Sequence, residues 1–133
     1  MAEGAGPILV VDDDDDARAA ISSLLESAGF STAQAETGEA ALTLARAVQP
    51  RAALVDVYLP GLSGYEVCHR LKAEYGEALP VVLVSRERRK DLDRVAGALL
   101  GADDCVTSPV ARDELLSLVE RLLERMPDLR PQS

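Results

Sequence analysis

The sequence predicts a doubly wound α/β fold, in which helices cover both faces of a parallel sheet. Short apolar runs alternate with longer segments of helical spacing, which gives five strand–helix units. The candidate strands are apolar throughout, as is typical of parallel strands that are buried on both faces. The connections are short, so consecutive units can pack on one sheet. At 133 residues, the chain is long enough for one core.

The first two units show the pattern most clearly. Strand 8–11 (ILVV) precedes a helix that Gly29 ends. A strand near 31–35 leads to Thr37, whose side chain suits an N-cap, and the next helix runs until Pro50. We expect the apolar face of the first helix to consist of Ala17, Ala20, Ile21, Leu24, Leu25 and Ala28.

The three later units repeat this order of strand and helix. The expected strands are 52–56, 81–84 and 104–106, and the helices that follow are about 64–74, about 90–100 and a last helix lined by Leu115, Leu118, Val119 and Leu122. We expect residues 1–126 to form a single domain. Residues 127–133 contain two prolines and no periodicity, which indicates a C-terminal tail or the start of a linker.

Composition narrows the class of protein. Apolar residues make up 47% of the chain, yet no apolar stretch approaches the roughly 20 residues that a membrane-spanning helix needs. The N-terminus has no signal-peptide pattern, so we expect a cytoplasmic location, with Cys68 and Cys105 as reduced, small apolar side chains. The net charge of −9 argues against direct binding of nucleic acid.

Carboxylates follow two of the expected strands directly. Asp12 and Asp13 come after the first strand, and Asp56 closes the third. If these strands are neighbours, the three side chains meet at one edge of the sheet, where they repel one another unless a cation lies among them. Hard oxygen ligands with no His or Cys nearby suit Mg²⁺.

The chain resembles a receiver domain of the response regulators of two-component signalling systems, similar to the chemotaxis regulators, over residues 7–125. The motifs that carry the resemblance are ILVVDDD, LVDVYLPGLSGYEVC, PVVLVS, GADD at 101–104, and SP at 108–109 followed by DELL. The resemblance implies a flavodoxin-like (βα)5 fold with a five-stranded parallel sheet in the order 2-1-3-4-5.

The resemblance also implies a role for each matching residue. Asp56 matches the aspartate that accepts a phosphoryl group from a histidine kinase or phosphotransfer protein. Asp13 matches a direct Mg²⁺ ligand, Asp12 a ligand that acts largely through water, and the backbone carbonyl of Tyr58 completes the protein's share. Ser85 matches the hydroxyl that donates to a phosphoryl oxygen and moves when the switch operates.

Three positions depart from the family pattern. Ser108 stands where the family has a lysine that pairs with the phosphoryl group, and Cys105 replaces the aromatic residue of the last strand. Arg86 stands where a small residue is usual and begins the basic run RERRK. One hypothesis is that Arg86 or Arg88 supplies the missing charge. The favoured interpretation of the run is a solvated loop that balances an acidic edge.

The other polar residues near the motifs have simpler interpretations. Residues 14–16 are favourable negative charges at a helix N-terminus, and His69 is a surface residue. Gly61 and Gly64 suit the tight turn after Pro60. The ring of Tyr58 either shields the phosphoryl group from water or projects into solvent, and the sequence does not decide between these.

We therefore expect a receiver domain whose phosphorylation changes partner binding through the face formed by the fourth helix, fifth strand and fifth helix. The partners would be a downstream protein or an attached output domain, or a second copy of the chain. A pseudo-receiver that acts without phosphorylation is the alternative. A phosphatase or mutase with an aspartyl nucleophile is disfavoured, because Tyr58 stands where such enzymes carry a second acid.

Overall fold

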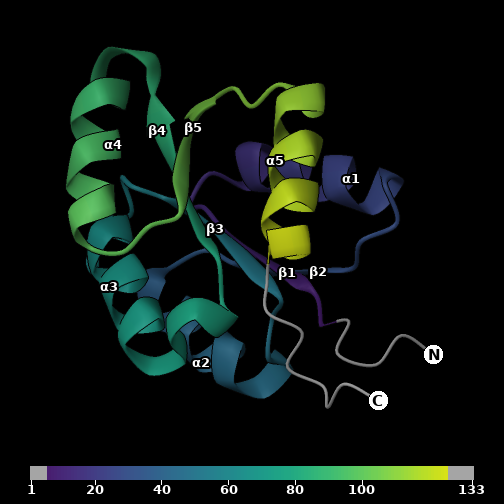
Figure 1. Cartoon of the computed structure of the whole chain (residues 1–133), viewed down its shortest axis with the longest axis horizontal. Coiled ribbons are helices and arrows are strands. Elements are labelled where there is room, and N and C mark those ends of the chain that lie inside the picture. Colours follow the sequence, from purple (N-terminus) through teal and green to yellow (C-terminus); the bar gives the residue numbers. More distant parts are fainter. Residues whose placement is uncertain (1–5, 126–133) are drawn as a thin grey trace.

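The computed structural model describes residues 6–125 and has the expected doubly wound architecture (Figure 1). Five parallel strands form one sheet in the order β2-β1-β3-β4-β5, as the resemblance implied. The strands are β1 Ile8–Val11, β2 Thr32–Ala35, β3 Ala52–Asp56, β4 Val81–Arg86 and β5 Asp104–Ser108. The expected tail 127–133 lies outside the described residues. Within residues 6–125, none of the helices combines the length and apolar character that a bilayer span requires.

Helices cover both faces of the sheet. They are α1 Asp15–Ser27, α2 Gly38–Val48, α3 Gly64–Tyr75, α4 Lys90–Leu99 and α5 Arg112–Arg125, with two short 3-10 turns, η1 Gly76–Ala78 and η2 Glu87–Arg89. Helices α1 and α5 lie on one face, and α2, α3 and α4 on the other (Figure 1). Strand β1 contributes to two cores in alternation: Ile8 and Val10 pack with the α1 and α5 side, and Leu9 and Val11 with the opposite side.

The ends of the helices follow from local side-chain chemistry. Thr37 caps α2 as predicted, because its hydroxyl accepts the backbone N–H of Ala40. Gly29 follows α1 with φ of +97°, a conformation that glycine adopts without strain. The predicted face of α1 was too wide: Ala20 and Ala28 are exposed, because α1 meets the sheet through a narrow stripe centred on Ile21, Ser22 and Leu25.

Strands β4 and β5 extend two residues beyond their predicted ends. Their pairing continues from Val84 with Val106 to Ser85 with Thr107 and Arg86 with Ser108. The polar residues that suggested the end of each strand are thus part of the sheet. This extension fixes the backbone of Ser85 and Arg86 in the sheet.

Helix α4 inverts the usual arrangement of apolar and polar faces. Its large apolar side chains Leu92, Val95 and Leu99 are 59%, 62% and 83% exposed, whereas Asp93 and Gly97 are buried. A Cβ on Gly97 would lie 2.5 Å from Cδ1 of Leu83, so a larger residue would require the Leu83 side chain to move. The helix therefore presents an unpartnered apolar stripe outward and a carboxylate inward.

Candidate functional site

The three predicted carboxylates meet at the carboxyl edge of the sheet. Strands β1 and β3 are neighbours, with Val11 paired to Val55, so Asp12 and Asp56 emerge side by side. Carboxylate oxygens of Asp12, Asp13 and Asp56 all lie within 4.8 Å of one another. Asp12 is buried, Asp56 half-buried and Asp13 exposed, so the cluster opens to solvent on one side.

Backbone donors orient two of these carboxylates. The N–H of Tyr58 donates to Oδ1 of Asp56 at 3.0 Å, and the N–H of Asp14 donates to Oδ1 of Asp12 at 2.9 Å. The guanidinium of Arg18 donates to the backbone carbonyl of Asp12 at 2.7 Å, which ties α1 to the end of β1. The side chains are therefore held in place before any ligand binds.

The two predicted turn glycines have different functions. Gly61 has φ of +71° and makes the turn after Pro60, as expected. Gly64 is instead the first residue of α3, and a Cβ there would lie 2.0 Å from the carbonyl oxygen of Asp56. The helix can approach the acidic strand end only because position 64 has no side chain.

Electrostatic strain in the cluster is visible in its pKa values. Burial, reinforced by the charges of Asp56 and Asp13, raises the pKa of Asp12 from its ordinary 3.8 to about 6, although the Asp14 N–H opposes this. Burial also raises the pKa of Asp56, while the Tyr58 N–H and nearby Arg86 oppose the shift. Ionised carboxylates are thus costly here without a compensating cation.

The donor set fits Mg²⁺ on chemical grounds. It consists of hard carboxylate oxygens, with no imidazole or thiolate in the cluster, and two of its acids have raised pKa values. The cavity beside it has a volume of about 280 Å³ and is also lined by Ser85, Arg86 and Ser108. Space for a phosphoryl group therefore adjoins the carboxylates.

The three atypical positions have distinct surroundings. Arg86 lines the cavity, and its guanidinium stacks on the ring of Tyr58 with its carbon 4.3 Å from the ring centroid. Ser108, at the end of β5, lines the cavity. Cys105 is buried near the start of that strand. Cys68 and Cys105 are both buried free thiols, as predicted.

The Tyr58 side chain does not project freely into solvent, which was one of the two predicted alternatives. Its hydroxyl donates to Oδ2 of Asp93 at 2.5 Å, and Arg86 covers its ring. Tyr65 of α3 also donates to Asp93, as does Ser85. The sequence analysis missed Asp93, and the available signal was an acid four residues before Gly97, on the side of α4 opposite the apolar stripe.

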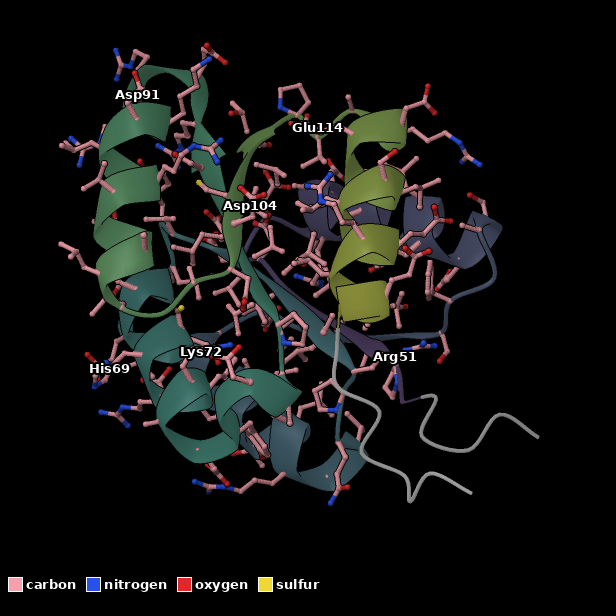
Figure 2. All side chains as sticks on the ribbon, viewed as in Figure 1. Arg51, His69, Lys72, Asp91, Asp104 and Glu114 are labelled. Atoms are coloured by element: carbon pink, nitrogen blue, oxygen red, sulfur yellow. The ribbon has the colours of Figure 1, made fainter. Side chains whose placement is uncertain are left out.

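The remaining polar residues lie as expected. Asp14 caps α1 by accepting the N–H groups of Asp16 and Ala17, and Asp15 and Asp16 occupy the first turn. His69 is exposed on the outer side of α3 (Figure 2). Asp14 and Ala17 line the acidic cavity, whereas Asp15, Asp16 and His69 do not.

Comparison with known proteins identifies the class that this fold and site define. The sequence model of the family described as the response regulator receiver domain matches residues 8–120 of this chain. Response regulator MprA of Mycobacterium sp. (strain KMS) is 42% identical over 127 residues, which cover 95% of this chain and 54% of that protein. DNA-binding response regulator MtrA of Mycolicibacterium smegmatis is 38% identical over 121 residues, covering 91% and 52%.

Solved structures agree with this relationship. The receiver domain of NtrX from Brucella abortus superposes with a TM-score of 0.83 at 32% identity, covering 89% of this chain and 98% of that domain. A putative response regulator from Chloroflexus aurantiacus gives a TM-score of 0.84 at 31% identity, covering 90% and 98%.

The chain therefore belongs to the response regulator receiver domain family of two-component signalling. Receiver domains are generally not classical enzymes, and they bind Mg²⁺ at an acidic pocket of this kind. The phosphatase alternative is not favoured. The chain spans about half the length of the relatives MprA and MtrA.

Proposed function

We propose that Asp56 accepts a phosphoryl group in a Mg²⁺-dependent reaction, and that this modification changes how the domain binds its partner. The observation that carries the proposal is the convergence of three carboxylates, within 4.8 Å of one another, beside a cavity lined by Ser85. The donor would be a histidine kinase or phosphotransfer protein. The cytoplasmic location remains a prediction from the N-terminal sequence.

The reaction requires a nucleophile that the donor can reach and charge compensation. A carboxylate oxygen of Asp56 bonds to phosphorus, while the bond from phosphorus to the donor's imidazole nitrogen breaks and the imidazole leaves with the electron pair. Asp12, Asp13, Asp56 and the backbone carbonyl of Tyr58 would hold Mg²⁺, which supplies positive charge that offsets the charges of the nucleophile and the phosphoryl group. Ser85 would donate to a phosphoryl oxygen.

Arg86 is our candidate for the cation that a lysine at position 108 would otherwise supply. It lines the same cavity as Asp56, and its positive charge opposes the rise in the pKa of that carboxyl group that burial causes. Arg88 belongs to the same basic run but lies outside the lining of the cavity. Stacking on Tyr58 holds the Arg86 guanidinium near the cavity although the side chain is exposed.

The output surface would be the face formed by α4, β5 and α5. Leu92, Val95 and Leu99 form an exposed apolar stripe on α4. Asp104 lies between α4 and α5 (Figure 2) and contacts Arg94 at 2.7 Å and Arg121 at 3.8 Å. A downstream protein, an attached output domain or a second copy of the chain would bind there, and the net charge of −9 disfavours direct contact with nucleic acid.

The first test is an intact-mass measurement after incubation with acetyl phosphate and Mg²⁺. We expect a gain of one phosphoryl group that is acid-stable and base-labile, and that is absent from Asp56→Asn and from samples with EDTA. Arg86→Ala should slow the reaction or shorten the lifetime of the product, whereas Arg88→Ala serves as the matched control and should not. No mass gain in the wild type, with Mg²⁺ binding shown separately, would favour the pseudo-receiver.

A further inference from the structure

Asp93 is a buried carboxylate that three hydroxyl groups from different elements contact. Its side chain is 0% exposed. Oδ2 accepts hydrogen bonds from Ser85 of β4 and from Tyr58, both at 2.5 Å, and Oδ1 accepts one from Tyr65 of α3. A buried carboxylate is costly unless it is hydrogen-bonded, so these three donors are what makes its position in α4 possible.

The Ser85 hydroxyl has only one proton to donate. Its nearest acceptor is Oδ2 of Asp93 at 2.5 Å, and the backbone carbonyl oxygen of Arg86 is further away at 3.3 Å. Ser85 is 1% exposed although it lines the acidic cavity. An ionised carboxylate is a strong acceptor, and so is a phosphoryl oxygen. A phosphoryl group on Asp56 and the carboxylate of Asp93 therefore compete for the same proton.

The bond from Ser85 also attaches α4 to the sheet. The helix begins without a side-chain N-cap and turns its large apolar residues outward. Asp93 thus provides a hydrogen bond between the first turn of α4 and β4. Loss of the Ser85 donor would leave Asp93 with two donors, both tyrosines.

We propose that Asp93 is a positioning residue that holds the Ser85 hydroxyl away from the acceptor site, so that phosphorylation breaks the Ser85–Asp93 bond and loosens α4. The inference rests on the proposed phosphorylation of Asp56. It assigns Asp93 a role in setting the balance between two states, one with the Ser85 hydroxyl bonded to Asp93 and one with it bonded to the phosphoryl group. This differs from a purely structural role. If Asp93 only stabilised the fold, replacing it would have the same effect with and without a phosphoryl group in the acidic cavity.

The test uses beryllofluoride, a non-covalent mimic of the phosphoryl group, bound to the full chain with Mg²⁺ and followed by ¹⁹F NMR. Asp93→Asn keeps the shape of the side chain but replaces a charged acceptor with a weaker neutral one. Because Ser85 is then easier to release, we expect roughly fivefold to tenfold tighter binding of beryllofluoride.

Two further variants separate the inference from a structural effect. In a Ser85→Ala background, Asp93→Asn should leave the affinity unchanged, because the competing proton is already gone. Tyr65→Phe removes a donor to Asp93 without touching the cavity, and it should weaken binding, because Asp93 then depends more on Ser85. This variant also tests the inference if Asp93→Asn does not fold, as judged by far-UV circular dichroism.

The outcomes distinguish the inference from the proposed function. If the wild type binds beryllofluoride and Asp93→Asn binds it equally or more weakly, the inference is overturned and the phosphoryl site stands. The inference is also overturned if Asp93→Asn raises the affinity for beryllofluoride equally with and without the Ser85 hydroxyl. If neither the wild type nor any variant binds, the proposed function fails, and the inference fails with it.

Discussion

Replacing Asp12 with asparagine should stabilise the metal-free protein at neutral pH. The amide side chain would keep an oxygen to accept the N–H of Asp14, which donates to Asp12 at 2.9 Å, but would carry no charge among the carboxylates. The pKa of Asp12 is raised from 3.8 to about 6, mainly by burial. The folded state therefore binds a proton more tightly than the unfolded state.

The sign and size of the effect follow from this difference. Below about pH 4, Asp12 is protonated in both states and has no cost. As the pH rises through 6, the folded state must also ionise Asp12. A rise in pKa of about two units, at 1.36 kcal/mol per unit, then lowers the free energy of unfolding by about 3 kcal/mol. The gain from Asp12→Asn should thus approach about 3 kcal/mol at pH 7.5 and fall to roughly half of that at pH 5.

Urea unfolding in EDTA, followed by circular dichroism at both pH values, measures this gain. Asp16→Asn is the control, since it removes a charge from the same acidic run at an exposed position where the helix N-terminus favours the anion. Adding Mg²⁺ should stabilise the wild type more than Asp12→Asn. An equal gain at both pH values, or none at pH 7.5, would refute our account of the cluster.

Three further predictions concern packing and burial in the domain. Gly64→Ala should lower the free energy of unfolding by about 2 kcal/mol or more in urea titrations, because its Cβ would lie 2.0 Å from the Asp56 carbonyl oxygen; an unchanged midpoint would contradict this. Lys72→Met should cost about 3 kcal/mol, because Lys72 and Asp103 form a nearly buried ion pair at 3.0 Å; a loss below about 1 kcal/mol would mean that the pair acts as an exposed one. Burial raises the pKa of Cys68 to about 11, so iodoacetamide at pH 8 should modify it far more slowly in the folded protein than in urea, and equal rates would show that the thiol is accessible.

Much of the fold could be predicted because its signals are local. Strands β1, β3 and β4 are short, largely apolar runs, since both faces of the sheet are covered there, whereas the edge strand β2 (TAQA) is only partly buried. The N-cap at Thr37 is visible from one side chain. The strand order came from the resemblance rather than from periodicity. The exposed Ala20 and Ala28 were mispredicted because alanine fits either side of a helix.

The acidic cluster was also predictable, because the carboxyl ends of neighbouring parallel strands share an edge. The surroundings of Asp93 were not, since its donors Tyr58, Tyr65 and Ser85 lie 35, 28 and 8 residues away in the sequence. Only the packing of α4 against β4 and α3 brings these groups together. An acid in the first turn of a helix is normally interpreted as a solvated surface residue until its partners are known.

The atypical positions together suggest a different route from the acceptor to the surface of the domain. Ser108 and Cys105 give β5 neither a cation nor a ring with which to respond to a phosphoryl group. Ser85 and Arg86 both lie at the end of β4, which continues through η2 directly into α4. If these two residues make the protein's contacts to the phosphoryl group, the response passes from β4 to α4 through Asp93, and the exposed apolar stripe of α4 is the first surface that it changes.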